Sequence, residues 1–357
     1  MNTSALQFTA SHEWGEQMPI KVLIVDDSIV FRQIIAKGIQ TDPEIEVVAT
    51  ATDPFDARDK ILKYEPNVLT CDIEMPKMNG IEFIRRLLPQ YSIPTIVVSS
   101  VSDKVFDAMD AGAVDFVTKP DAQSPEGVQR FIKELIGMIR AASKAHIENQ
   151  ILKSSVRSVR EKTPDAEIRN FDLIAIGAST GGTEAIFNLL MQLPAQLPGI
   201  VIVQHIPPVF SRMFADRLNK QTVFQVKEAE NGDLVERRHV YVAPGDKHVQ
   251  IRKTDRGYML KVFEGEKVNG HCPSVDVMFN SVAEEAGARA MGVILTGMGY
   301  DGAKGITLMK RRGAVTIGQD EKTSVVYGMP KAAYDLKGVL KQSAIDTMGH
   351  CMMQYLK

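Results

Sequence analysis

The sequence predicts two α/β domains in one chain, each built on a mostly parallel sheet that helices cover on both faces. Its 357 residues exceed what one typical hydrophobic core holds. Short apolar runs alternate with amphipathic segments twice, first over residues 20–140 and again from Phe171 onward. Apolar strands separated by helices are typical of parallel sheets that are buried on both faces. Residues 141–170 are polar and lack aromatic side chains, so we expect a mobile linker between the two domains.

The composition is that of an ordinary globular protein, with 44% hydrophobic and 24% charged residues. A formal net charge of -2 gives no electrostatic reason to expect nucleic acid or an anionic membrane as a partner. The cysteines Cys71, Cys272 and Cys351 are far apart, which argues for a reducing compartment and against a disulfide framework or a zinc site. Residues 1–19 contain no continuous apolar segment, so we expect an N-terminal extension on a cytoplasmic protein without membrane insertion.

Acidic residues mark the strand ends of the first domain. Its predicted strands are IKVLIVDD, EIEVVATA, NVLTCD, TIVVSS and AVDFVTKP, and helical patterns such as SIVFRQIIAKGIQ and GIEFIRRLLPQY lie between them. Asp26 and Asp27 end the first strand, and Asp72 ends the third. Because ligands of open α/β sheets gather at the carboxyl ends of strands, these carboxylates should form one oxygen-rich site suited to Mg²⁺. Lys119 can reach the same site from the end of the fifth strand.

Each of these acidic residues, taken singly, is explained by a solvated turn at a strand end. Taken in order, DD, D-x-x-M-P-x-M-x-G, SS and K-P make residues 20–140 resemble a response-regulator receiver domain, which has a flavodoxin-like (βα)5 fold. The resemblance implies that a histidine kinase phosphorylates Asp72. It further implies Mg²⁺ ligation by Asp26 (through water), Asp27, Asp72 and the Glu74 carbonyl, a phosphoryl contact from Lys119, and a switch pair formed by Ser99 and Phe116. We also expect a cis peptide bond between Lys119 and Pro120.

The second domain, residues 171–357, is predicted to be a doubly wound α/β domain with a small antiparallel hairpin region. FDLIAIGAS and GIVIVQH read as strands around a helix from about Thr183 to Gln192. HVYVAP, HVQIRK and YMLKVF indicate the hairpin region. ARAMGVILTG and AVTIGQ are further strands, with a helix after Asp301 between them.

Three strand ends of this domain carry a nucleophile, an imidazole and a carboxylate. Ser179 lies in the Gly-rich turn GASTGG, His205 ends the next strand, and Asp301 lies in TGMGYDG. A serine at a helix N-terminus has free backbone N–H groups nearby that can receive developing negative charge. The three residues therefore meet the spatial requirement of a Ser-His-Asp triad.

Other interpretations compete with a triad. A dinucleotide-binding turn needs a carboxylate at the end of the second strand, where this sequence has Gln204 and His205. An α/β-hydrolase fits G-x-S-x-G, but its triad runs Ser, Asp or Glu, then His, whereas the order here is Ser179, His205, Asp301. Taken alone, Ser179 is explained as a helix cap and His205 as a loop residue.

Six motifs of this domain decide between these interpretations, namely IGASTGG, QHIP, YVAPGDKH, H-C-P-S-V-D-V-M-F, ILTGMGYDGA and YGMPKAA. In this order they resemble the catalytic domain of the chemotaxis protein-glutamate methylesterases, the CheB family. The resemblance implies a serine hydrolase without a cofactor at the hydrolase site, acting on glutamate methyl esters and particular glutamines of chemoreceptors. Its site would comprise Ser179 as nucleophile, His205 as base, Asp301 as orienting carboxylate, the Met298 backbone N–H in the oxyanion hole, and Thr180, Ser274 and Asp276 as lining. His248 and His271 lie in such motifs, and we expect each to have a structural role, or one that supports the catalytic residues, rather than a part in the chemistry.

A DNA-binding output domain is the alternative from another functional class. Neither a helix-turn-helix pattern nor a basic face follows the linker, which argues against it. Because the linker makes docking intramolecular, we expect the unphosphorylated receiver to cover the strand ends that carry Ser179. A fragment that begins near Glu161 should then be more active than the full chain.

Overall fold

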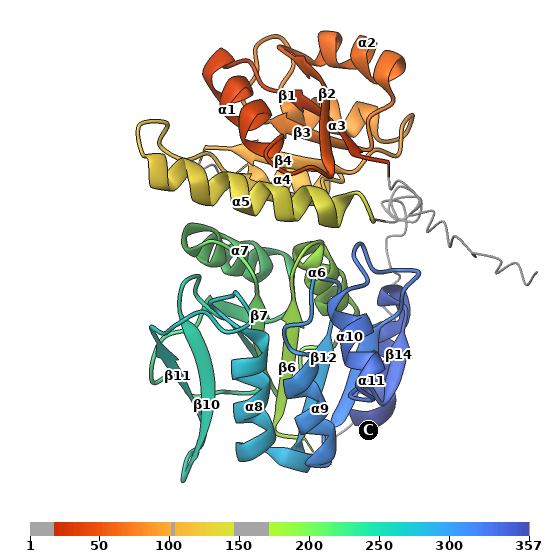
Figure 1. The fold of residues 1–357 in the computed structure, drawn as a ribbon. Helices are drawn as coiled ribbons and strands as arrows, with labels where there is room; N and C mark the ends of the chain where they lie inside the picture. The colour runs from red at the N-terminus through yellow and green to blue at the C-terminus, as the bar shows by residue number, and fades with distance from the viewer. Residues whose placement is uncertain (1–17, 101–103, 146–170, 357) are drawn as a thin grey trace, which may run out of the picture.

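The structure is a computed structural model that describes residues 18–100, 104–145 and 171–356. It contains two α/β domains, drawn one above the other in Figure 1. The first domain has a parallel sheet in the strand order β2-β1-β3-β4-β5. Its elements are β1 (Ile20–Val25), α1 (Ile29–Ile39), β2 (Ile45–Ala51), α2 (Pro54–Tyr64), β3 (Val68–Asp72), α3 (Gly80–Leu87), β4 (Thr95–Ser99), α4 (Val105–Asp110), β5 (Asp115–Thr118) and α5 (Pro125–Ala142).

Helix starts in the first domain follow the capping residues of the sequence. The side chains of Ser28, Asp53, Asn79 and Ser124 accept hydrogen bonds from backbone amides in the first turns of α1, α2, α3 and α5. Every residue of β3 and β4 is buried, as expected for central strands covered on both faces. The predicted strands and helices of this domain are therefore confirmed.

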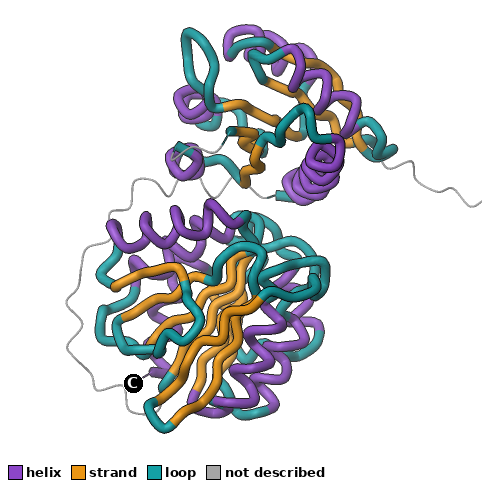
Figure 2. The backbone as a smooth tube through the Cα atoms, turned by 90° about the vertical axis from the view of Figure 1, so that its left-hand side faces the viewer, coloured by secondary structure: helices purple, strands orange, loops and turns teal. Residues whose placement is uncertain are grey.

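The second domain has a larger parallel sheet in the order β14-β13-β12-β6-β7-β9-β8, together with a separate antiparallel pair of β10 and β11. Its strands run together through the middle of the domain (Figure 2). The elements are β6 (Leu173–Ala178), α6 (Gly182–Gln192), β7 (Gly199–Gln204), α7 (Pro208–Gln221), β8 (Gln225–Glu228), β9 (His239–Val242), β10 (His248–Thr254), β11 (Gly257–Phe263), α8 (Val275–Glu285), η1 (Gly287–Arg289), β12 (Ala290–Ile294), α9 (Ala303–Arg311), β13 (Val315–Gln319), α10 (Met329–Asp335), β14 (Lys341–Ser343) and α11 (Ile345–Leu356).

The centre of this sheet is formed by β12, β6 and β7, which are neighbours. All residues of these strands are buried, and apolar side chains dominate them. Their complete burial explains why the sequence shows continuous apolar runs here rather than an alternating pattern. The carboxyl ends of the central strands therefore lie side by side on a rigid base.

Two predictions about local structure are wrong. The segment HVYV, assigned to the hairpin region, is β9 of the main sheet, where Val240 pairs in parallel with Ile200 and Val226. Its side chains are buried in the core of the main sheet. This burial outweighs its closeness in sequence to β10, so the segment joins the main sheet. The peptide bond before Pro120 is trans, and in the described part of the chain the cis bond is Cys272–Pro273. The two isomers of an X–Pro bond differ by only about 0.5–1 kcal/mol, so sequence alone does not decide between them.

The predicted N-terminal extension and most of the predicted linker lie outside the described residues. Helix α5 ends at Ala142 and is followed by a short turn. None of the helices in the described ranges is both long and apolar enough to span a bilayer.

Candidate active site

Three loops at the carboxyl edge of the large sheet carry the predicted triad residues. Ser179 follows β6, His205 follows β7, and Asp301 lies in the loop between β12 and α9. Because these strands are neighbours, residues far apart in sequence meet at one edge. The His205 Nε2 and Asp301 Oδ2 atoms lie 2.9 Å apart, and both side chains are almost fully buried.

The Asp301 carboxylate sits at the N-terminus of α8 and accepts hydrogen bonds from several donors. Oδ2 accepts from the Val275 amide at 2.7 Å, and Oδ1 accepts from the Ser274 hydroxyl and the Asn269 amide group, each at 2.8 Å. Although burial opposes ionisation, His205 and these donors hold the pKa of Asp301 well below its usual range. The carboxylate is therefore charged and oriented before any substrate binds.

The bond to Asp301 also settles which nitrogen of His205 carries the proton. An ionised carboxylate can only accept, so Nε2 must be the protonated donor, and in the neutral ring Nδ1 then keeps its lone pair. Nδ1 is buried and has no hydrogen-bond partner among the described residues. His205 thus offers an unused acceptor nitrogen, as a general base requires.

Backbone contacts fix the position of Ser179. Its amide donates to the Thr296 carbonyl at 3.0 Å, and the Gln204 side chain donates to the Ser179 carbonyl at 2.9 Å and to the His205 carbonyl at 3.0 Å. A Cβ atom at Gly297 would lie 2.7 Å from the Ser179 Cβ, so this position has room only for glycine. The neighbouring Met298 amide donates to no acceptor within the described ranges and is free to bind a developing oxyanion.

Sequence reasoning missed two residues that organise this edge, Gln204 and Asn269. From the sequence, Gln204 is notable only because it stands where a dinucleotide-binding turn would need a carboxylate. Asn269 donates to Asp276 as well as to Asp301, each at 2.8 Å. The Asn-Gly dipeptide at Asn269 is the usual signal of a tight turn, and it could have drawn attention to this loop. Ser274 and Asp276, expected to line the site, both contact Asp301.

The acidic residues of the first domain converge as predicted. Carboxylate oxygens of Asp26, Asp27 and Asp72 lie within 4.8 Å of one another. The Lys119 Nζ atom lies 2.8 Å from Asp26 and 2.6 Å from Asp72. Burial lowers the pKa of Lys119, but the two carboxylates outweigh it and raise that pKa above its usual value. A set of hard oxygen donors beside a lysine fits a Mg²⁺ site.

Ser99 and Phe116, the predicted switch pair, lie on the neighbouring strands β4 and β5. The Ser99 hydroxyl donates to the Ser100 carbonyl at 2.8 Å. Phe116 is buried, with its ring centroid 6.0 Å from that of Phe106 and 4.6 Å from that of Phe210 in the second domain. The Glu74 amide lies 3.3 Å from Asp72, which brings this residue to the acidic site.

Comparison with known proteins gives the family. A family model described as CheB methylesterase matches residues 174–352, and one described as response regulator receiver domain matches residues 22–127. A protein-glutamate methylesterase/protein-glutamine glutaminase 2 of Syntrophomonas wolfei is 50% identical over 337 residues, covering 94% of this chain and 98% of that protein. The chain belongs to the CheB methylesterase family.

Further CheB relatives support this assignment. A protein-glutamate methylesterase/protein-glutamine glutaminase of Salmonella typhi is 45% identical and covers 90% of this chain and 92% of its own length. The crystal structure of the Thermotoga maritima CheB methylesterase catalytic domain matches with a TM-score of 0.51 and 33% identity, over 52% of this chain and all of that one. The predicted receiver and doubly wound catalytic folds are confirmed, and the DNA-binding alternative is not supported.

The receiver of this CheB-family chain docks on the catalytic domain through α4, β5 and α5. Arg217 of α7 is buried and its guanidinium pairs with Asp110 of α4 and, at 2.8 Å, with Glu184 of α6. The guanidinium carbon also lies 5.6 Å from the centre of the Phe106 ring. Charged and aromatic groups from both domains therefore share one buried contact.

The docked receiver reaches the loops that hold the predicted catalytic residues. Asp115 of β5 is hydrogen-bonded to the side chain of Thr180, the residue after Ser179, and burial raises the pKa of Asp115 to about 6. Val325 and Val326 of the catalytic domain belong to the same buried apolar cluster as Phe131 of α5. Thr180, expected to line the site, thus also faces the receiver.

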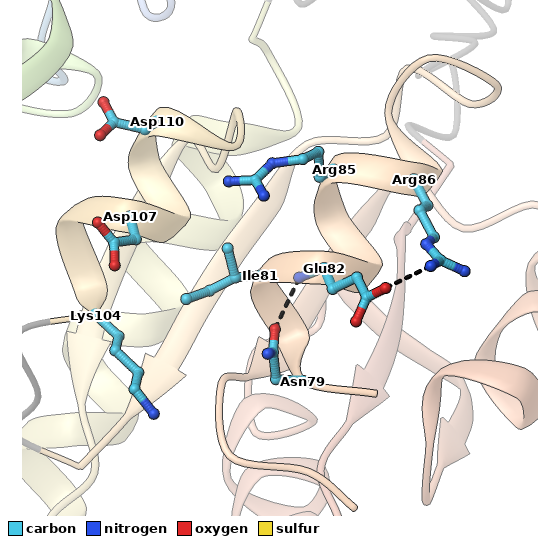
Figure 3. Close-up of a pocket in the computed structure, with 8 residues that line it drawn as sticks. All are labelled: Asn79, Ile81, Glu82, Arg85, Arg86, Lys104, Asp107 and Asp110. Carbon is cyan, nitrogen blue, oxygen red and sulfur yellow. Dashed lines mark hydrogen bonds and ion pairs between the residues drawn. The ribbon is translucent and has the colours of Figure 1, made fainter. Parts of the chain in front are cut away.

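A separate groove runs between α3 and α4 of the receiver (Figure 3). Acidic and basic side chains both line it, and Glu82 pairs with Arg86 at one end. Asp110 lies at the other end, next to its partner Arg217. No residue of the catalytic loops lines this groove, so it is not part of the hydrolase site.

Proposed function

We propose that this chain is a protein-glutamate methylesterase that also deamidates particular glutamines, and that its receiver domain controls access to the hydrolase site. The family membership and the names of the relatives support the activity. The observation that carries the site assignment is the charged Asp301, fixed at the start of α8, which holds His205 beside the Ser179 loop with Nδ1 free.

The reaction starts when Ser179 Oγ attacks the carbonyl carbon of a glutamate methyl ester. The hydroxyl proton passes to His205 Nδ1, and Asp301 stabilises the imidazolium that forms. When the tetrahedral intermediate collapses, the bond between carbon and methoxy oxygen breaks and His205 protonates the leaving methanol. Water then attacks the acyl-enzyme with His205 again as base, which regenerates Ser179. A glutamine amide passes through the same steps and releases ammonia.

Backbone donors stabilise the negative charge of the intermediate. The free Met298 amide lies in the glycine turn packed against Ser179, which supports its role in the oxyanion hole. Met298 and Tyr300 are 41% and 56% exposed, and in this proposal the substrate helix rests on them.

Phosphorylation of Asp72 opens the site in this proposal. Asp26, Asp27, Asp72 and the Glu74 carbonyl would hold Mg²⁺, which neutralises the acidic cluster when it is bound. The Asp72 carboxylate forms a bond to phosphorus as the bond between phosphorus and the donor breaks, and Lys119 contacts the phosphoryl oxygens. Ser99 and Phe116 then rearrange, and because Phe116 packs against Phe210, the docking surface changes with them.

The partners of this proposal are a histidine kinase as phosphodonor and the cytoplasmic helices of methyl-accepting chemoreceptors as substrate. Both partners place the protein in the cytoplasm. The contact between Asp115 and Thr180 supports the view that docking and substrate binding exclude each other. The unphosphorylated receiver is then mainly an inhibitor.

Methanol release from methylated receptor membranes tests the activity. Ser179→Ala should lower turnover by on the order of a million-fold, as loss of a triad nucleophile does in comparable hydrolases. Ser281→Ala is the matched control, because it removes a buried serine hydroxyl of α8 that bonds the Met278 carbonyl. If the folded Ser179→Ala protein keeps a tenth or more of the wild-type rate, Ser179 is not the nucleophile.

A further inference from the structure

A tight turn at residues 268–271 lies against the catalytic pair. Val268 and His271 exchange both of their backbone hydrogen bonds at 3.0 Å, while Asn269 and Gly270 adopt left-handed φ angles of 54° and 86°. Positive φ at both central residues is the geometry that Asn-Gly favours in two-residue turns. The turn therefore holds the side chains on either side of Gly270 in fixed directions.

Both of these side chains meet the catalytic pair. Asn269 donates to Asp301 at 2.8 Å. The His271 ring stacks on the His205 ring, with the centroids 3.7 Å apart and the planes inclined by 8°. Asp301 and His205 are each supported by one residue of the same short turn.

We propose that His271 is a positioning residue for the hydrolysis, which fixes the ring plane of His205 and offers the π face of an uncharged imidazole to the imidazolium that forms. The proposal rests on the proposed function, because it assigns the support of His205 as general base. It concerns the orientation and charge of His205 and places no bond between His271 and the substrate.

The need for a second support follows from the contacts of His205. A single hydrogen bond from Nε2 to Asp301 leaves the ring free to rotate about the line that joins the two atoms. Such a rotation would change the direction in which Nδ1 points. A parallel ring at 3.7 Å blocks the rotation, because any tilt of His205 would bring its atoms into contact with His271.

Charge gives the second part of the argument. Burial, and then the charge of His205, lower the pKa of His271 to about 4. His271 is therefore neutral while His205 gains and loses its proton. A cation over a neutral aromatic face is stabilised, whereas two stacked imidazolium rings would repel each other. The charged groups that act on His271 are His205, Asp301 and Lys267, and Lys267 also disfavours a second positive charge.

The test compares His271→Ala and His271→Phe in the full-length protein, activated with Mg²⁺ and acetyl phosphate. The matched control is His350→Phe, which changes an exposed histidine of α11. In methanol release, His271→Ala should lower kcat by about three- to tenfold, the range expected for one aromatic pair, with little change in KM. His271→Phe keeps a stacking face and should recover at least half of the wild-type kcat.

A second readout does not depend on receptors. A sulfonyl fluoride modifies Ser179 with loss of fluoride only if His205 removes the hydroxyl proton, and mass spectrometry follows the adduct. Across pH 5 to 9, His271→Ala should slow this labelling and shift the pH below which the labelling rate falls, relative to wild type. His271→Phe should slow the labelling less than His271→Ala does. Wild-type labelling without receptor hydrolysis would contradict the proposed function alone. Equal labelling rates and pH profiles in His271→Ala and wild type would overturn the role of His271. An equal loss of labelling rate in His271→Ala and His271→Phe would overturn it too.

Discussion

Docking of the receiver can be weakened by one substitution that leaves the catalytic residues in place, Arg217→Met. In the docked structure the Arg217 guanidinium pairs with Asp110 of the receiver and lies over its Phe106 ring. In the open form it would keep only its interactions within the catalytic domain, the ion pair with Glu184 and the Phe187 ring at 5.0 Å. The substitution therefore removes more from the docked form than from the open form.

The size of the effect follows from the two interactions that Arg217 makes with the receiver. The Asp110 side chain is 42% exposed, so its ion pair contributes about 1 kcal/mol or less. The cation–π interaction with Phe106 is partly desolvated and contributes about 1 kcal/mol. Together they give roughly 2 kcal/mol, or about thirtyfold in the ratio of docked to open protein.

The assay is methanol release by the unphosphorylated full-length protein, divided by the rate of the fragment that begins near Glu161 and carries the same substitution. The division removes any effect on the hydrolase site itself. The ratio should rise by up to about thirtyfold for Arg217→Met, with the rate of the free fragment as its ceiling. Arg212→Met, an exposed arginine on the same helix, should leave the ratio unchanged. An unchanged ratio for Arg217→Met would refute the reasoning.

Three further predictions concern the two sites and their coupling. Asp72→Asn should abolish acid-labile phosphorylation by acetyl phosphate. Asp27→Asn should weaken Mg²⁺ binding more than Asp26→Asn does. Equal Mg²⁺ affinities of these two variants in a fluorescence titration would contradict a direct role of Asp27. Asp301→Asn should lower kcat less than Ser179→Ala, because His205 remains but can adopt the wrong tautomer, and comparable losses in methanol release would argue otherwise. The pKa of Asp115 is about 6 when docked against an ordinary 3.8, so docking takes up a proton and is favoured as the pH falls through 6 toward 4. The ratio of full-length to fragment activity should therefore rise with pH between 4 and 7 in wild type, and it should stay flat and low in Asp115→Asn.

The strand ends of both domains could be predicted because buried parallel strands have a strong sequence signal. Ser179, His205 and Asp301 each follow a continuous apolar run, and neighbouring parallel strands bring such ends together. The acidic cluster of Asp26 and Asp72 is located in the same way. The positions of these residues are set by the sheet, and the strands of the sheet are visible in a single sequence as apolar runs.

Residues whose position depends on loop geometry or on docking could not be predicted. The stacking of His271 on His205 requires the turn at Asn269 to be oriented by α8 and β11, and no periodicity encodes that orientation. Arg217 and Asp110 are 107 residues apart and meet only because two domains pack together. The misplacement of β9 has a related cause, since its main-sheet partners are distant in sequence while the hairpin is adjacent.

In the proposed mechanism, the receiver and the substrate compete for the surface at Thr180, which is hydrogen-bonded to Asp115 of the docked receiver. By thermodynamic reciprocity, any factor by which docking weakens substrate binding is also the factor by which bound substrate weakens docking. The apparent substrate affinity of the unphosphorylated enzyme is reduced by its open fraction. A dense array of substrate would pull part of the enzyme open before any phosphate arrives. Receptors would then act as activators of their own demethylation, and phosphorylated Asp72 would be stabilised wherever receptors are concentrated.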